Sequence, residues 1–566
     1  MLTRLALTLA FALALSAPAS AAPRDEALRL APSDFALVVV VQNLRDHTKT
    51  VSESPFAGWF PTTALGKQLL GGDAFKRLTD GATPIFGALG VTSSDLLQDI
   101  IGDAVVFAYS PGAAGDPKGE RSVIIVRPRK PDTLASVIEK LNKAQTDSKE
   151  LKAVVERKHA GAAYHERQKA AGASDFYCFR NGVFVFSQSE AEIKAAIDRD
   201  AEDTKIKVPV LIARLAKLDV ADAAAVVLVN PRALDAELAA KVKAANAGEK
   251  AFLTKFAEVW AATEAAAVYF ALDTGAELGV SLQFNADKLP AGAKGWLTGA
   301  RTPSAVWAAI PDDALLAVAG RLKPTDLLDF LGALNAGDGK PTARETVEQI
   351  LGPIIGKDKL PAVLDALGPD WGAWVVPGAK DAAVPTVIAA IKVQGAKDAE
   401  AAKSLTQALE YGFQVARIAY NAKHKDQLDL KEEKDGDAVI KSLVGDGLPA
   451  GLRPSFALKG GYLLISTSPD AIKSFKPPTG EPKAGGDVPI ARFSGTATRA
   501  YLTANAAPLA KLLATAGGGE EKALVEQLVG FAAVLEPVDK IELLTRGDAT
   551  GVKLMLRVKT AKPLKK

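Results

Sequence analysis

Residues 176–195 read FYCFRNGVFVFSQSEAEIKA, and residues 455–474 read SFALKGGYLLISTSPDAIKS. The two stretches align without a gap, so Gly182 faces Gly461 and the surrounding apolar residues agree in position. Each stretch has two short apolar runs around a glycine turn, which predicts a β-hairpin, followed by a serine and a helical segment. Similarity between distant parts of one chain indicates a repeated structural unit, so we expect two copies of one fold.

Three further matches between the two halves of the chain occur in the same order as this one. They pair Pro32–Asp34 with Pro311–Asp313, Leu97–Gly112 with Val363–Gly378, and Leu272–Phe284 with Leu544–Leu556. Each match is short, but four in the same order are improbable by chance. They predict an internal duplication with a first lobe at residues 25–298 and a second, duplicate lobe at residues 303–562.

The order of the expected elements defines the fold class. The expected strands are mostly adjacent in sequence and joined by tight turns, and helices lie between some of them. A doubly wound parallel sheet would need regular alternation of strands and helices, which this chain lacks. We therefore expect an α+β fold: two homologous tandem lobes, each an antiparallel sheet with helices packed on one face.

The N-terminus has the pattern of a secretory signal peptide over residues 1–21. Arg4 supplies the positive charge, Leu5–Leu15 the apolar core, and Ala19–Ala21 the small-residue cleavage site. The apolar run is shorter than the roughly 20 residues that a membrane-spanning helix needs. The sequence thus predicts cleavage near Ala21 and a soluble, exported protein, periplasmic or extracellular, without a transmembrane anchor.

Composition indicates a globular protein and argues against a nucleic-acid partner. Hydrophobic residues make up 48% of the chain and charged residues 24%, with a net charge of +3. Removal of the signal peptide with Arg4 lowers this charge to +2, and the basic residues do not cluster strongly. A value so close to neutrality does not favour binding to nucleic acid.

The residues that might act as nucleophiles have structural explanations. Cys178, the single cysteine, lies in an aromatic strand, and its counterpart in the second copy is Ala457. We expect it to be a buried core residue, as free cysteines often are. Ser189 and Ser468 precede helical segments, where a serine side chain commonly caps the free backbone amides.

The chain contains no linear motif of a known catalytic, cofactor or metal site. His159 and His165, with the adjacent Glu166, are the nearest approach to a ligand set. Their spacing of six does not place both rings on one helical face, and zinc sites normally show a fuller set of ligands. We therefore interpret this segment as a solvated loop and predict no catalytic, cofactor-binding or metal-binding residues.

The most suggestive cluster is Trp59-Phe60, inside a segment rich in proline and glycine. Such aromatic residues can form an apolar contact patch, either a docking surface or the mouth of an apolar pocket. The alternative is that both rings fold back over a sheet edge before the next helix. The second interpretation is favoured because large aromatic side chains are buried on average.

The first hundred residues resemble a family of exported bacterial proteins of unknown function that is frequent in planctomycete-type genomes. The resemblance rests on the opening segment Ala31–Val40, on Leu44-Arg45-Asp46 and on Ser54-Pro55-Phe56. It implies export and an uncharacterised role. It implies no catalytic residue.

Three hypotheses for function remain open from the sequence. The first is an exported, non-enzymatic protein with a binding or structural role. The second is a carrier for an apolar ligand such as lipid, held between the lobes or between sheet and helices. The third is a hydrolase whose site is assembled from residues without a linear motif. The sequence does not identify the partner; a protein or a lipid ligand is the candidate.

Overall fold

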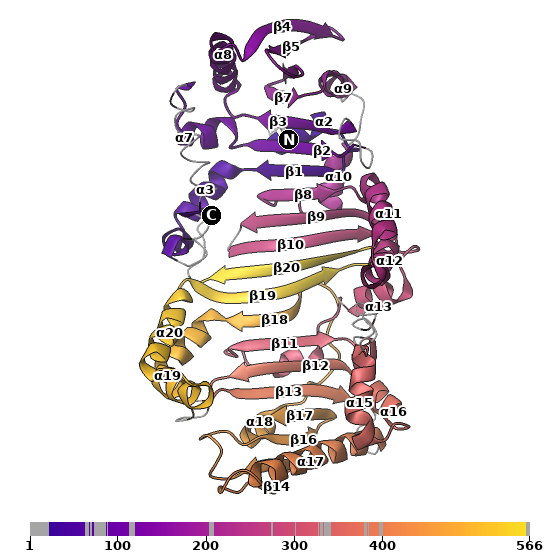
Figure 1. The fold of residues 1–566 in the computed structure, drawn as a ribbon, viewed down its shortest axis with the longest axis vertical. Coiled ribbons are helices and arrows are strands. Elements are labelled where there is room, and N and C mark those ends of the chain that lie inside the picture. Colours follow the sequence, from indigo (N-terminus) through magenta and orange to yellow (C-terminus); the bar gives the residue numbers. More distant parts are fainter. Residues whose placement is uncertain are drawn as a thin grey trace, which may run out of the picture. The chain divides into compact units, whose positions relative to one another are not determined.

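The computed structural model combines helices with antiparallel sheet, as expected for the α+β class (Figure 1). It describes residues 22–62, 67, 71–72, 87, 89–112, 119–202, 209–272, 275–299, 301–326, 328, 332, 341–378, 382, 384–394 and 400–561. The predicted signal peptide at residues 1–21 lies outside these residues. No helix in the described ranges is both long and apolar enough to cross a membrane.

The chain forms two compact units. Unit 1 comprises residues 1–49 and 69–233, and unit 2 comprises residues 50–68 and 234–566. Residues 234–298, expected in the first lobe, therefore pack with the second half of the chain. The compact units do not coincide with the predicted lobes 25–298 and 303–562.

Unit 1 contains an antiparallel sheet of eight described strands. In spatial order they are β4 (Leu151–His159), β5 (Ala162–Lys169), β6 (Asp175–Arg180), β7 (Val183–Ser187), β3 (Arg121–Arg127), β2 (Ala104–Ser110), β1 (Leu37–Gln42) and β8 (Ala225–Val229).

Helices cover both faces of this sheet. Its main helices are α2 (Pro23–Leu30), α8 (Pro131–Asp147), α9 (Glu190–Glu202) and α10 (Val210–Lys217), and the shorter ones are α3 (Leu44–Ser52), α7 (Ser93–Asp95), η2 (Leu96–Ile100) and η4 (Pro231–Leu234). Helices α2 and α9 pack on the face that contains the fully buried Val106 and Ile125. Helix α8 packs on the opposite face, where Leu134 joins a cluster with Tyr177 and Phe184. The prediction of helices on one face is therefore wrong, because the far end of the second face is also apolar and is buried by α8.

Unit 2 contains an antiparallel sheet of twelve described strands. In spatial order they are β9 (Thr263–Leu272), β10 (Gly275–Phe284), β20 (Gly551–Thr560), β19 (Val538–Gly547), β18 (Val488–Ser494), β11 (Leu316–Arg321), β12 (Leu367–Val376), β13 (Thr386–Val393), β17 (Tyr462–Ser466), β16 (Ser455–Lys459), β15 (Ala438–Val444) and β14 (Asp429–Asp435).

The helices of unit 2 are arranged around this sheet in the same way. They are α4 (Pro55–Trp59), η1 (Phe60–Thr62), α11 (Asp235–Ala244), α12 (Ala247–Ala262), α13 (Ala291–Gly299), η5 (Ala305–Ala309), α15 (Ala343–Ile355), α16 (Leu360–Ala366), α17 (Glu400–Asn421), α18 (Pro469–Ser474), α19 (Gly495–Gly517) and α20 (Glu521–Val534). Elements η5 and α18 bury the face that contains Trp374. Helix α17 covers the other face at one end of the sheet, where Phe413 packs against Phe456 at 4.7 Å. Figure 1 shows α19 and α20 along one side of the strands and α12, α13 and α15 along the other.

The two sheets share one succession of strands. The order β4-β5-β6-β7-β3-β2-β1-β8 in unit 1 reappears as β14-β15-β16-β17-β13-β12-β11-β18 in unit 2. The register agrees as well: Leu37 pairs with Tyr109, and Leu316, which occupies the same place, pairs with Val375. Agreement of both order and register is what two copies of one fold would produce.

A small hydrogen-bond motif also occurs twice. The Ser187 hydroxyl donates to the Ser122 carbonyl at 2.7 Å and accepts the backbone N–H of Ser189 at 3.0 Å. In unit 2 the Ser466 hydroxyl donates to the Val387 carbonyl at 2.8 Å and accepts the N–H of Ser468 at 3.1 Å. In both places a buried strand-end serine orients the start of the helix that follows.

Several local predictions can be compared with the structure. Asn181 and Gly182 have φ values of 48° and 80°, which confirms the predicted hairpin turn. Ser468 is the N-cap residue of α18, but its side chain makes no capping hydrogen bond, so that part of the prediction is wrong. The amide hydrogen bond to the Ser466 hydroxyl holds this turn instead.

Two predictions about sequence segments are wrong. The segment around His159 and His165 is not a loop, because it forms the β4–β5 hairpin. Its strands carry many charged residues, so the apolar alternation of a half-buried strand is weak. The match of Leu272–Phe284 with Leu544–Leu556 is out of register, because Gly275 begins β10 whereas Gly547 ends β19.

A buried acid connects three elements of unit 1. The Asp200 side chain on α9 is only 3% exposed and accepts hydrogen bonds from Arg180 at 2.8 Å and from Arg29 at 3.1 Å. Arg29 lies on α2, and Arg180 ends β6. The Asn181 amide, at 3.2 Å, adds a contact from the β6–β7 turn. Asp200 thus joins both covering helices to the sheet.

We predict that Asp200→Ala lowers the stability of unit 1 by about 2–4 kcal/mol, because it leaves two partly buried arginines without their acceptor. The measurement is the urea midpoint, read by hydrogen–deuterium exchange of peptides from α2 and α9. Asp147→Ala is the control, since its exposed carboxylate pairs with the exposed Lys143 of the same helix, and it should cost less than about 1 kcal/mol. Equal shifts in the two variants would contradict this role for Asp200.

Candidate apolar binding face

One face of the unit 2 sheet carries a continuous row of apolar side chains that runs across nine strands. Residues directly opposite each other in an antiparallel pair project to the same side of the sheet. Following the partners from strand to strand therefore defines a set of residues on one face, here called the central row. Its members are Phe270, Leu278, Leu556, Leu543, Ala491, Val318, Ala373, Ala389 and Ile465.

A second row lies beside the central row, two residues along each strand, and is here called the side row. Its members are Leu272, Ala276, Val558, Ile541, Phe493, Leu316, Val375 and Val387. Both rows consist entirely of apolar residues. The face that they share is called the open face below.

None of the residues in the two rows is buried. Leu278 is 52% exposed, Leu316 is 44% exposed and Leu556 is 41% exposed. Single exposed apolar residues are normal on protein surfaces, but a contiguous apolar patch of this kind usually marks a binding surface. The open face is therefore the strongest candidate site in the described residues.

On β10, β20, β19 and β18 the opposite face carries charges. Directly behind the two rows, Glu277 pairs with Arg557, Arg557 with Glu542, and Glu542 with Arg492. The Arg557 guanidinium lies 2.7 Å from Glu277. Burial disfavours the charge on Arg557, but hydrogen bonds to Glu277 and Asp487 outweigh it and raise the pKa of this side chain. The alternation of the strands thus places ion pairs on one face and uncharged side chains on the other.

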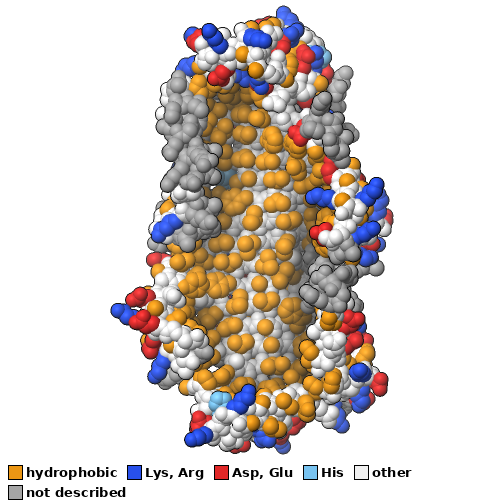
Figure 2. Space-filling view, in the orientation of Figure 1, with side chains coloured by type: hydrophobic (Ala, Val, Ile, Leu, Met, Phe, Trp, Pro, Cys, Tyr) orange, Lys and Arg blue, Asp and Glu red, His pale blue; other side chains and the backbone are white. Residues whose placement is uncertain are grey.

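The open face lies at the bottom of a hollow. Figure 2 shows hydrophobic side chains gathered along the unit 2 sheet between two ridges. By comparison with Figure 1, the ridges are α19 and α20 on one side and α12 and α15 on the other. At one end the hollow is closed, because α17 covers Phe456, which is the partner of Ile465 in the next strand. Within unit 2, the sheet forms the floor of a trough and the helices form its sides.

Comparison with family models, with curated proteins and with solved structures gave no match. The resemblance of the first hundred residues to an exported bacterial family therefore stays a prediction.

Unit 1 has a row at the corresponding place of its own sheet. Val227, Val39, Phe107, Ile124 and Phe186 face one another across β8, β1, β2, β3 and β7. Phe107 and Ile124 are both 38% exposed. The next partner, Tyr177, is buried beneath α8, as Phe456 is beneath α17. Each unit therefore leaves one apolar face of its sheet partly open.

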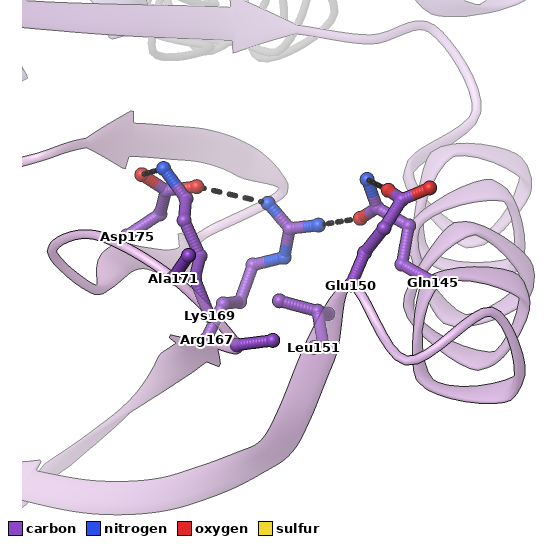
Figure 3. Close-up of a pocket in the computed structure, with 8 residues that line it drawn as sticks. Gln145, Glu150, Leu151, Arg167, Lys169, Ala171 and Asp175 are labelled. Atoms are coloured by element: carbon purple, nitrogen blue, oxygen red, sulfur yellow. Dashed lines mark hydrogen bonds and ion pairs between the residues drawn. The ribbon is translucent and has the colours of Figure 1, made fainter.

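A polar pocket in unit 1 is a second concave site. It has a volume of about 340 Å³ and is lined by Gln145, Glu150, Leu151, Arg167, Lys169, Ala170, Ala171 and Asp175 (Figure 3). The two carboxylate oxygens of Asp175 lie 3.3 Å from Arg167 and 2.7 Å from Lys169. Arg167 also donates to the side-chain amide oxygens of Asn142 and Gln145. The charges of the pocket thus neutralise one another, which is typical of a structural network.

The structure does not bring the two histidines together as a metal site. His159 contacts Asp198 at 2.8 Å, whereas His165 stacks on Tyr177 at 4.8 Å. Among the described residues, no three His, Cys, Asp or Glu side chains are placed to hold a metal ion.

Trp59 and Phe60 lie in the short elements α4 and η1, and both side chains are half-buried. The segment belongs to unit 2. The prediction of an apolar contact patch at these two residues stays a prediction.

The sequence contains a signal for the open face. In β10 the residues Ala276, Leu278, Val280 and Leu282 alternate with polar or small residues, and β20 alternates in the same way except at the buried Met555. Alternation identifies an apolar face but does not reveal whether another layer covers it. The exposure of the face could be recognised only once the positions of the helices were known.

Cys178 is fully buried in β6, and Ala457 is equally buried at the matching place in β16, which confirms that this cysteine is a core residue. Burial raises the pKa of the Cys178 thiol to about 12. At pH 8 the thiolate fraction is then on the order of one in ten thousand.

We predict that native Cys178 does not react with a maleimide within hours at pH 8, but reacts within minutes in urea. Mass spectrometry of the intact chain measures the labelling. Cys178→Ala should keep the native circular dichroism spectrum, because alanine already occupies the matching place in unit 2. Fast labelling of the native protein would contradict this burial.

Proposed function

We propose that this chain is a non-enzymatic protein that binds an apolar ligand of the lipid class along the open face of unit 2. The observation that supports the proposal is the pair of registered apolar rows, all of whose members are accessible. Contact with an apolar ligand would remove this surface from water, at about 25 cal/mol for each Å². The driving force for binding is therefore hydrophobic.

The form of the face favours a ligand over a permanent structural partner. In a soluble α+β protein, the apolar face of a sheet is normally buried by a layer of helices. Here the helices stand beside much of the floor, and the charged residues lie on the opposite side. An apolar ligand between the helices would supply the missing layer.

We also propose that the chain arose by internal duplication. Three of the four sequence matches, the common strand order, the common register and the repeated serine motif all support this origin. A duplicated binding fold would explain why unit 1 has an apolar row at the corresponding place.

An exported location is part of the proposal, as the N-terminal segment predicts. In a bacterial host, the chain recovered outside the cytoplasm should lack residues up to about Ala21, as measured by intact mass. Leu9→Arg, which places a charge in the apolar stretch, should keep the full-length chain in the cytoplasm. Export of an unprocessed chain, or of the Leu9→Arg variant, would contradict a signal peptide.

The test of the binding site uses the neutral fluorescent dye N-phenyl-1-naphthylamine as the probe. We expect its fluorescence to rise when it binds, and we expect Leu278→Asp and Leu556→Asp to weaken binding at least tenfold. These two leucines face each other on the neighbouring strands β10 and β20, within the central row, where a carboxylate would lose its hydration when the probe covers it.

Val210→Asp is the matched control. Val210 lies on α10 in unit 1, is 51% exposed and is as accessible as Leu278. The control should leave dye binding unchanged, and melting curves should show that all three variants fold. Unchanged binding in the two leucine variants would contradict the assignment of the site to the open face.

A further inference from the structure

The geometry of the open face points to one class of ligand. We propose that it binds the long, unbranched acyl chain of a lipid, laid across the strands along the central row, and recognises the chain and not the head group. This inference rests on the proposed binding function. It adds the shape, the direction and the chemistry of the ligand.

The length of the face fits a long chain. The central row crosses nine strands, from Phe270 to Ile465, and neighbouring strands are about 4.8 Å apart, which gives a row about 38 Å long. A saturated chain of eighteen carbons is about 20 Å long, given C–C bonds of about 1.5 Å. The row is therefore longer than one such chain.

The width of the face also fits a single chain or two side by side. The central and side rows are two residues apart along each strand, or about 7 Å. Beyond the ends of the strands, the helical ridges limit the hollow in both directions (Figure 2). A long, narrow apolar floor accommodates an extended hydrocarbon better than a compact, bulky ligand.

Charge explains why the chain and not the head group would be recognised. Neither row contains a charged or polar residue. The cations of the neighbouring strands, Arg557 and Arg492, lie on the opposite face, where they pair with acids. Where the central row ends beneath α17, Lys441 is held by Glu410 at 2.7 Å and by Glu432 at 3.1 Å. A free carboxylate head group would gain no cation from the floor.

A second copy of the chain is a poorer occupant of this face. Two sheets that pack face to face lie about 10 Å apart, and a stable interface buries about 800 Å² on each partner. The ridges formed by α19 and α20 on one side, and by α12 and α15 on the other, would hold another flat sheet away from the floor. A thin, flexible chain can enter between the ridges.

The first experiment compares chain lengths and head groups. Fatty acids of ten to eighteen carbons and their methyl esters, below their aggregation concentrations, displace the dye from the full-length protein. We expect the affinity to rise about twofold for each methylene, since only one side of the chain contacts the floor, or on the order of 100-fold over the series. The affinities of each acid and of its methyl ester should agree within about threefold.

The second experiment shortens the trough. Ala491 on β18 lies in the middle of the central row, and unit 1 carries the larger Val227 at the matching place in its own sheet. The Ala491 side chain is only half-buried, on the open face, so Ala491→Phe should fold with its ring over the floor. We expect this variant to lower the affinity for the eighteen-carbon acid at least tenfold. The affinity for the ten-carbon acid should stay within about twofold of that of the unchanged protein, because the segment from β9 to β19 still holds a short chain.

A control and four outcomes complete the test. Ala390→Val changes the buried face of β13 and should alter stability without changing the dependence on chain length. Equal affinities for ten and eighteen carbons would overturn the extended chain, and an acid that binds much more tightly than its ester would overturn recognition by the chain alone. Failure of the dye and of every lipid to bind would instead overturn the proposed function itself. Concentration-dependent dimers that disappear in Leu278→Asp would show that a second copy occupies the face.

Discussion

The antiparallel register of the unit 2 sheet is the constraint on which the rest of the structure depends. Side chains alternate between the two faces of a strand, so register alone decides which residues share a face. From β9 to β17 the register joins apolar residues to apolar residues and, between them, Glu277 to Arg557. A slip of one residue in a single strand would place charges in the trough and leucines behind it.

Local features of the fold could be predicted from the sequence, and distant ones could not. The Asn181-Gly182 turn and the buried Cys178 follow from neighbouring residues, and the structure confirms both. The β4–β5 hairpin was missed because its strands are rich in charge, and it is held by its place between α8 and β6. The open face depends on pairs such as Leu278 and Leu556, which no local pattern connects.

The face behind the trough differs between the two halves of the unit 2 sheet. From β11 to β17 the face behind the trough is an apolar core, in which Trp374 is buried by η5 and α18. From β10 to β18 the corresponding face carries ion pairs instead. The open face, in contrast, is apolar along the whole length of the two rows. A surface that is apolar throughout, in a sheet whose other face varies, indicates a requirement of function and not of folding.

The pairing of β10 with β20 has a consequence for how such a chain avoids self-association. Each of these strands closes a hairpin and would otherwise present a row of unpaired backbone groups, which is a template for aggregation. The pairing is symmetric about Gly279 and Met555, which occupy the same place in their respective strands. The contact is therefore isologous, with a local dyad between two equivalent hairpins. A chain with only one of these hairpins could reach this arrangement only as a homodimer; here one polypeptide contains both partners, so the edge is closed at any protein concentration.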